Sequence, residues 1–287
     1  MKAIIAGASG LVGQALSDFL KNKGYEVIAL KRPQDWDPEK GQINLELLEG
    51  SEVIINLAGE SIMGYWTEAK KERIRKSRVD ATQVIVEAIN KLKNPPKLLL
   101  NASAIGYYGD SGEVIVNELS SPGSNFLSSV VKDWEIIASQ ATCRTVFLRF
   151  GVVLSKNGGA LKLMLMPFKL GLGGTLGSGN QYMSYIMISD LVEAAYHIIN
   201  QPEISGPVNI VASESITNRE FTETLGKVLN RPTILPMPEF AVKTLLGDMG
   251  NELFLASERV DPSVLKKSGF KWKSQNLEEA LLMEMKN

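Results

Sequence analysis

The stretch KAIIAGASGLVG at residues 2–13 decides how this chain folds. A short apolar run at residues 2–6 leads into three glycines, and residues 11–21 then show the apolar spacing of a helix. In such a unit the first glycine permits a tight turn, the second lets the backbone approach a pyrophosphate, and the third lets helix and strand pack closely, while the helix amino terminus attracts the anion. The predicted nucleotide contacts in this stretch are Gly7, Ser9, Gly10, Leu11, Val12 and Gly13. The alternative is a tight strand-to-helix turn that binds no ligand.

The end of the second apolar run, at residues 25–30, indicates which nucleotide binds. A site for NAD usually carries an acidic residue there, which hydrogen-bonds the ribose hydroxyls. This chain has Lys31 and Arg32 instead. A guanidinium can form a bidentate, charge-assisted pair with a 2′-phosphate, so Lys31 and Arg32 predict NADP as the cofactor. The alternative is a solvated pair of basic residues on the surface.

Apolar runs and helical patterns alternate along the first half of the chain. Further runs at residues 53–57, 97–102 and 144–150 are separated by helical stretches at 67–91 and 125–140. Continuous apolar strands between helices predict an α/β fold with a Rossmann-like, doubly wound parallel sheet. After about residue 155 the chain becomes rich in glycine and proline, which predicts a smaller, helix-rich C-terminal lobe. The expected division is an NADP-binding Rossmann domain at 1–155, which also takes in about 186–211, and a substrate-side lobe at 156–185 and 212–287.

Other predicted cofactor contacts lie at strand ends and on one helix. Leu57, Ala58 and Gly59 follow a buried strand, where small residues admit a ligand to the carboxyl edge of a parallel sheet. Arg78 falls on the apolar stripe of the helix at 67–91, and a buried guanidinium needs an anionic or hydrogen-bonding partner. That partner is either a cofactor phosphate or a structural carboxylate. The remaining predicted contacts are Asn101 and Val153.

Composition excludes several classes of function. The 287 residues carry 31 basic and 32 acidic side chains, so no global positive field exists to hold nucleic acid. With one cysteine, Cys143, and one histidine, His197, the chain has no internal disulfide and no three-histidine or four-cysteine zinc site, and we expect no metal. No apolar run approaches the ~18 residues that span a membrane, and no targeting signal opens the chain. A cytoplasmic location is the expectation.

Several motifs together resemble a known superfamily. The glycine motif, the NLAG sequence at residues 56–59 and Ser103 after the strand at 98–102 are similar to the extended branch of the short-chain dehydrogenase/reductases, which includes nucleoside-diphosphate-sugar epimerases. The sequences SAIGYYG at 103–109 and GPVN at 206–209 resemble its atypical "epimerase family protein" group, which has a short C-terminal domain. The resemblance covers essentially the whole chain. It implies a Rossmann fold and NADP binding, but no particular substrate.

The chain departs from this superfamily at the active site. The usual site has a serine or threonine together with a tyrosine and a lysine four residues apart on a helix. No tyrosine here has a lysine four residues later, and if Lys132 is the lysine, Ser128 stands in place of the tyrosine. Ser103 fills the serine position, or Ala104 does if the register shifts by one residue. The catalytic candidates are Ser103, Tyr107, Tyr108 and Lys132.

Each candidate also has a structural interpretation. The two tyrosines can pack as loop aromatics, and Lys132 can form a surface pair with Glu135 one helical turn away. Two functional hypotheses follow. The first is an NADP-dependent oxidoreductase or epimerase that acts on a small carbonyl, an alcohol or a nucleotide sugar, which approaches the glycine-rich loop at 171–179. The second is an NADP(H)-binding sensor or partner-binding protein without redox chemistry. Neither hypothesis involves nucleic acid or a membrane, and the resemblance suggests a homodimer.

Overall fold

The computed structural model describes residues 1–274 and 276–286 and is built around a six-stranded parallel sheet. The strand order is β12-β8-β6-β5-β1-β2. The chain adds β2 on one side of β1 and then places β5 on the other, so the connections reverse direction between β1 and β5. This confirms the predicted doubly wound, Rossmann-like sheet, whose ligand site is expected at that reversal. The strands are β1 (Lys2–Ala6), β2 (Glu26–Leu30), β5 (Val53–Asn56), β6 (Leu98–Ala104), β8 (Arg144–Phe150) and β12 (Gly206–Ile210).

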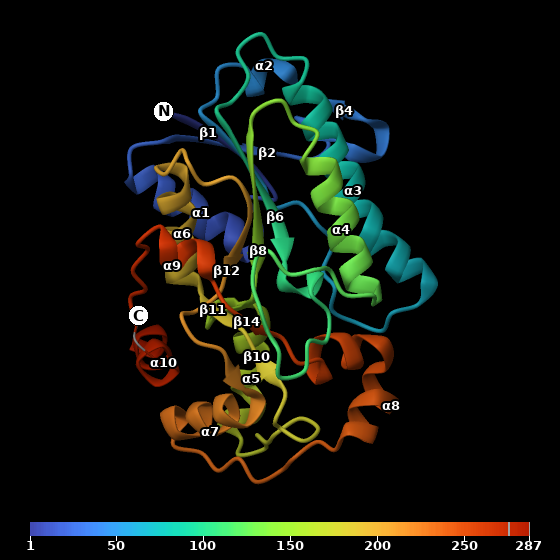
Figure 1. Ribbon diagram of the computed structural model, residues 1–287, viewed down its shortest axis with the longest axis vertical. Coiled ribbons are helices and arrows are strands. Elements are labelled where there is room, and N and C mark those ends of the chain that lie inside the picture. The colour runs from blue at the N-terminus through green and yellow to red at the C-terminus, as the bar shows by residue number, and fades with distance from the viewer. Residues whose placement is uncertain (275, 287) are drawn as a thin grey trace.

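Helices cover both faces of this sheet (Figure 1). Alternate strand residues such as Ile5 and Ile55 pack against α1 (Leu11–Asn22), α6 (Ile188–Ile199) and α9 (Ser263–Lys267). Their neighbours in the strands, such as Ile4 and Ile54, pack on the other side beneath α3 (Glu68–Ile89), beside which lies α4 (Phe126–Ala138). Because both faces are buried, the strands are apolar throughout, which is why the sequence shows runs instead of alternation.

Polar side chains fix where several helices begin. The hydroxyl of Thr67 accepts a hydrogen bond from the Lys70 amide at the start of α3, and Asn125 caps α4 in the same way. Thr217 and Glu220 form a complete capping box at α7 (Asn218–Leu229). These caps satisfy amides that have no partner within the helix.

The smaller lobe lies beyond the carboxyl edge of the sheet (Figure 1). A separate apolar cluster joins α5 (Gly159–Lys169), α7 and α10 (Leu277–Lys286) to the strand pair β9 (Val152–Ser155) and β11 (Tyr185–Met187). In the described part of the chain, no helix is long and apolar enough to cross a membrane. The remaining elements are β3 (Trp36–Asp37), η1 (Pro38–Lys40), β4 (Gln42–Ile43), α2 (Leu45–Leu48), η2 (Ile105–Tyr107), β7 (Ile115–Val116), β10 (Tyr182–Met183), β13 (Ile216–Thr217), α8 (Glu239–Gly250), η3 (Asn251–Leu255) and β14 (Arg259–Val260).

Candidate cofactor and active site

The glycine turn between β1 and α1 packs tightly against the chain on two sides and is open on the third. A Cβ on Gly13 would lie 2.3 Å from the carbonyl oxygen of Gly7, and one on Gly7 would lie 2.7 Å from that of Leu57. Gly7 also has a φ of +80°, which favours glycine. At Gly10 the only atom near such a Cβ is 3.5 Å away, and no side chain caps α1 there. The first amides of α1 therefore have no side-chain cap, and the turn leaves space beside Gly10 for a further group.

The other predicted contacts of the turn lie at the same edge. Ser9 is exposed, whereas Leu11 and Val12 are half-buried. The Leu11 side chain packs against Gly158 and Gly159, just after β9. Val153, in β9, is half-buried and packs on the same core cluster as Val12. The glycine turn and β9 thus come together although they are far apart in sequence.

The basic pair after β2 is exposed at the same edge of the sheet. The Lys31 amide donates to the Asp35 carboxylate at 2.8 Å, which closes a short turn. The Arg32 guanidinium carbon lies 4.5 Å from the centre of the Trp36 ring and has no carboxylate partner among the described residues. An arginine stacked on an indole keeps its hydrogen-bond donors free at the edge of the plane. Arg32 can therefore offer them to a 2′-phosphate.

Arg78 reaches the carboxyl end of β5 from helix α3. A Cβ on Gly59 would lie 3.3 Å from its guanidinium carbon, and Nη1 donates to the Ile74 carbonyl at 3.0 Å. Burial lowers the pKa of Arg78 to about 10, while the more distant charge of Glu60 opposes that shift. Within residues 1–274 and 276–286, no carboxylate lies within ion-pair distance of it. The described residues therefore do not provide the structural carboxylate that was the alternative partner of Arg78.

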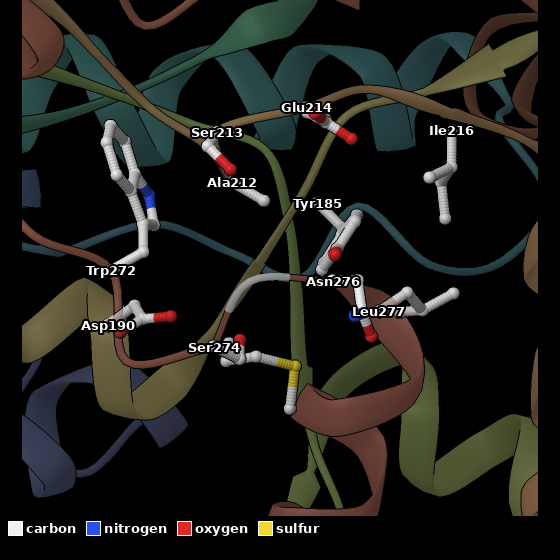
Figure 2. A pocket seen from close by; sticks show the side chains of 11 residues that line it. Tyr185, Asp190, Ala212, Ser213, Glu214, Ile216, Trp272, Ser274, Asn276 and Leu277 are labelled. Carbon is white, nitrogen blue, oxygen red and sulfur yellow. The ribbon is translucent and has the colours of Figure 1, made fainter.

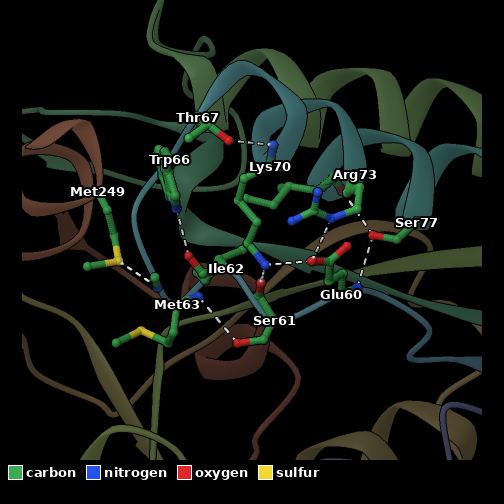
Figure 3. A network of polar contacts seen from close by, with 12 residues as sticks. Glu60, Ser61, Ile62, Met63, Trp66, Thr67, Lys70, Arg73, Ser77 and Met249 are labelled. Carbon is green, nitrogen blue, oxygen red and sulfur yellow. Dashed lines mark hydrogen bonds and ion pairs between the residues drawn. The ribbon is translucent and has the colours of Figure 1, made fainter. Parts of the chain in front are cut away.

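The nearest acidic residue, Glu60, is already paired. Its Oε1 accepts from Lys70 Nζ at 2.6 Å and from Arg73 Nε at 3.2 Å, and the Glu60 amide donates to Ser77 Oγ (Figure 3). This network neutralises Glu60 and leaves the Arg78 guanidinium beside Gly59 without an anionic partner. A phosphate at the end of β5 would supply that partner.

Asn101 lies opposite Asn56, the last residue of β5, at the carboxyl end of that strand. Its side chain is fully buried, its Oδ1 accepts from Asn56 Nδ2 at 2.7 Å, and its Nδ2 donates to the Ala102 carbonyl. Asn56 in turn accepts from the Ala58 amide. The Asn101 side chain therefore holds Asn56, which supports the Leu57–Gly59 loop, and both its amide oxygen and its amide nitrogen bind within the fold.

Two of the four catalytic candidates belong to one buried network. Ser103 Oγ donates to Glu135 Oε1 at 2.6 Å, and Arg149 binds both Glu135 oxygens at 2.8 Å. Arg149 Nη1 also donates to the Tyr108 hydroxyl at 2.9 Å, which donates to Asn209 Oδ1 at 2.7 Å. The chain of contacts links β6, α4, β8 and β12 across the sheet.

This network occupies the polar groups that a reaction would need. Ser103 is 2% exposed and Tyr108 is 4% exposed. Burial raises the pKa of Tyr108 to about 12, against the opposing effect of Arg149. Both hydroxyl protons are donated to protein acceptors, so the structure gives Ser103 and Tyr108 structural positions. Ala104, the alternative residue for the serine position, is the last residue of β6 and is half-buried.

Tyr107 differs from its neighbour. Its ring lies 3.5 Å from the Arg149 guanidinium carbon, and the residue is half-buried. Its hydroxyl makes no hydrogen bond with any residue that the structure describes. Of the two predicted proton donors, only Tyr107 therefore keeps its proton available.

Helix α4 does not provide the usual tyrosine and lysine. Ser128 is fully buried, and its Oγ lies 2.9 Å from the Gly106 carbonyl and 2.6 Å from Asn125 Oδ1. A Cβ on Gly123 would lie 2.8 Å from Ser128 Oγ, so the backbone of Gly123 packs closely against the Ser128 side chain. Lys132 is exposed to solvent, and its surface pair with Glu135 is not formed, because Glu135 binds Arg149 in the interior.

Several charged residues obtain their environment only from the tertiary structure. Arg149 and Glu135 were not paired, although a charged residue in the apolar run at 144–150 is a signal of a buried partner. Glu258 was missed altogether. It is half-buried but surrounded by protein between Tyr182 and Asp110, and burial, followed by the charge of Asp110, raises its pKa to about 8. No local pattern marks Glu258, since its environment comes from three distant segments.

Comparisons with known proteins identify the family. The model of the NAD dependent epimerase/dehydratase family matches residues 3–211, and that of a domain of unknown function, DUF1731, matches residues 237–282. The chain belongs to the NAD dependent epimerase/dehydratase family. This confirms the resemblance and explains the glycine turn, the strand order and the small C-terminal lobe as features of one family.

Relatives in this family span nearly the whole chain. Epimerase family protein MT2273 of Mycobacterium tuberculosis is 39% identical over 96% of this chain and 95% of its own. The crystal structure of human epimerase family protein SDR39U1 with NADPH has a TM-score of 0.91 and 33% identity, and the match covers 100% of both chains. A nucleoside-diphosphate sugar epimerase of Corynebacterium glutamicum has a TM-score of 0.81 and 34% identity over 99% of this chain and 58% of its own.

Proposed function

We propose that this protein binds NADPH at the carboxyl edge of its sheet and uses it to reduce a small carbonyl substrate, or to oxidise the corresponding alcohol. The observation that carries the proposal is the half-buried Arg78 guanidinium, which lies beside Gly59 without a carboxylate partner among the described residues. Gly59 follows Leu57, whose carbonyl packs against Gly7, so the unpaired cation and the open turn at Gly10 belong to one surface. The NADPH in the structure of human SDR39U1 supports this choice of nucleotide.

Each residue of this surface would have a distinct role. The free amides of α1 and the Arg78 guanidinium would hold the phosphates of the dinucleotide, and Arg32 would hold the 2′-phosphate. The bound nucleotide supplies a hydride to, or accepts one from, the substrate carbon. Tyr107 would donate the proton to the substrate oxygen, because its hydroxyl is the free one near the end of β6. A nucleotide sugar is one substrate class that the family includes.

A second candidate function is favoured by a specific observation. The position for the usual tyrosine is filled by Ser128 and closed by Gly123, and Lys132 faces solvent. A protein that binds NADPH as a sensor or as part of an interaction needs the cofactor surface but not the tyrosine and lysine. This candidate predicts nucleotide binding without turnover.

Titration with NADPH and with NADH, followed by nicotinamide fluorescence, tests the cofactor surface. Arg32→Asp is expected to weaken NADPH binding about tenfold or more while sparing NADH, because a charge-assisted contact to the 2′-phosphate is replaced by repulsion. Lys271→Asp, at an exposed lysine that makes no ion pair within the described residues, is the matched charge control. If neither NADPH nor NADH binds, both candidate functions are excluded.

A further inference from the structure

Two arginines of the proposed cofactor surface each lie against a buried indole ring. The Arg32 guanidinium carbon lies 4.5 Å from the centre of the Trp36 ring, and that of Arg78 lies 5.4 Å from the centre of the Trp134 ring. In the part of the chain that the structure describes, no other arginine stacks on a tryptophan, and neither of these two has a carboxylate partner. The same arrangement therefore occurs twice, at the two cations assigned to the nucleotide.

An indole face stabilises a cation in a different way from a carboxylate. A carboxylate occupies the N–H groups of a guanidinium, whereas an aromatic ring attracts its flat face and leaves the N–H groups at the edge of the plane free. The Arg32 side chain makes no hydrogen bond with the described residues, and Arg78 donates only through Nη1, to groups of its own helix. Both arginines are therefore held in place with donors still available to an anion.

Trp36 is a fixed support for Arg32. Its side chain is 2% exposed and packs in the apolar cluster that also contains Ala58, in the loop after β5. The backbone that carries Arg32 is fixed as well, because Lys31 and Asp35 exchange two hydrogen bonds of 2.8 Å. The Trp36 Nε1 makes no hydrogen bond within the described residues, so a phenylalanine ring can replace the indole without the loss of one.

Trp134 supports Arg78 from helix α4. It is 5% exposed, and its Nε1 donates to Thr82 Oγ1 at 2.7 Å. The same hydroxyl oxygen accepts from Asn56 Nδ2 at 2.8 Å, and Asn56 Oδ1 accepts from the Ala58 amide at 3.2 Å. One chain of hydrogen bonds therefore fixes the indole that faces Arg78 relative to the loop after β5.

We infer that Trp36 and Trp134 are positioning residues for the nucleotide, a role that rests on the proposed function. Trp36 presents Arg32 to the 2′-phosphate and so determines the preference for NADPH over NADH. Trp134 presents Arg78 to the phosphates that both nucleotides share and so determines the affinity for either. A side chain that is already ordered loses less conformational freedom when a ligand binds, so a ring that touches no ligand atom can still raise affinity.

Titration of the full chain with NADPH and with NADH, followed by nicotinamide fluorescence, tests both roles. Trp36→Leu is expected to weaken NADPH binding about fivefold and to leave NADH binding unchanged, because only the 2′-phosphate needs the guanidinium that loses its support. Trp134→Leu is expected to weaken the binding of both nucleotides about fivefold. The corresponding phenylalanine variants keep a ring in the core and should show the same selectivity with losses of about twofold, since indole attracts cations best.

Trp272→Leu is the matched control, because no guanidinium faces the Trp272 ring in the described part of the chain. It should leave the affinities for NADPH and NADH unchanged. A double-mutant cycle separates positioning from a general effect on the fold. In an Arg32→Asp background, Trp36→Leu should not change the ratio of NADPH to NADH affinity further, because no guanidinium remains to be positioned.

Three results would each overturn these roles while NADPH binding by the unaltered protein supports the proposed function. The first is equal weakening of both nucleotides, or of neither, by the Trp36 variants. The second is an effect of Trp36→Leu on the affinity ratio that persists in the Arg32→Asp background. The third is unchanged NADH affinity in the Trp134 variants. If the unaltered protein binds neither nucleotide, the proposed function fails as well.

Discussion

Tyr107 and Tyr108 are adjacent but occupy different environments, and their substitutions should separate reaction from stability. Tyr108→Phe removes the bridge between Arg149 and Asn209 and is expected to lower the free energy of unfolding by about 1–3 kcal/mol. Tyr107→Phe removes a hydroxyl that makes no hydrogen bond with the described residues, so the midpoint of thermal unfolding, Tm, should be unchanged. Because the proposed proton donor is lost, kcat of NADPH-dependent carbonyl reduction should fall at least tenfold while KM is unchanged. Thermal unfolding and steady-state kinetics on both variants measure this. Unchanged kcat in Tyr107→Phe would favour the sensor function.

Gly10 and Gly13 should respond to alanine in opposite ways. Gly10→Ala meets only one atom, at 3.5 Å, so the fold should tolerate it, but the methyl group would occupy the path of the pyrophosphate and weaken NADPH binding about tenfold. Gly13→Ala would place its methyl group 2.3 Å from the Gly7 carbonyl oxygen and should lower the free energy of unfolding by about 1–3 kcal/mol. Tm and NADPH titration distinguish the two. Equal loss of stability in both variants would contradict the separate roles assigned to them.

Between elements, the Glu135–Arg149 pair joins helix α4 to strand β8 inside the protein. Their side chains are 9% and 3% exposed, so removal of one charge leaves the other buried without compensation. Glu135→Gln is expected to lower the free energy of unfolding by about 3–5 kcal/mol, measured by denaturant unfolding. Glu278→Gln, which breaks the exposed pair with Lys227, should change it by less than about 1 kcal/mol. Similar losses of unfolding free energy in Glu135→Gln and Glu278→Gln would show that burial of the ion pair does not control its contribution to stability.

For the molecule as a whole, Glu258 should make stability depend on pH, because its environment between the sheet and the smaller lobe exists only in the folded state. Its pKa is raised from 4.5 to about 8 by burial and by Asp110. Between those pH values the folded state holds a proton that the unfolded state releases, so stability falls as pH rises through this window and is constant above it.

Glu258→Gln should remove this dependence. The neutral amide imitates the protonated carboxyl, so the variant should gain about 1–2 kcal/mol relative to the unaltered protein between pH 5 and pH 9, since partial exposure screens the charge. Tm at the two pH values measures the gain. Glu223→Gln, which makes the same charge change at an exposed site on α7, is the control. If the difference in Tm between Glu258→Gln and the unaltered protein is the same at pH 5 and pH 9, Glu258 ionises normally.

Patterns that are local in the chain were sufficient for much of the fold. Apolar runs indicated the buried strands, and the glycine spacing at residues 7–13 indicated the turn at the sheet edge. The cap at Thr217 follows from side chains three residues apart, which meet in any helix. Helical spacing alone predicts Arg78 on the same stripe as Ile74 and Ala81, and the structure leaves it half-buried there while both neighbours are fully buried.

By itself, therefore, the sequence determined the main strands of the parallel sheet, the helices between them and their order, and it predicts the edge at which a nucleotide would bind. Only the tertiary structure decided which partner each polar group meets. Ser103 and Tyr108 are residue types that often act in reaction sites. Here, however, the Ser103 hydroxyl donates to Glu135, and the Tyr108 hydroxyl donates to Asn209, which is 101 residues away in the sequence. Periodicity reports whether a side chain is buried, whereas a hydrogen-bond partner depends on which strands lie side by side and in what register. A hollow beside Tyr185 (Figure 2) likewise exists only where three distant segments meet, around Tyr185, Glu214 and Trp272.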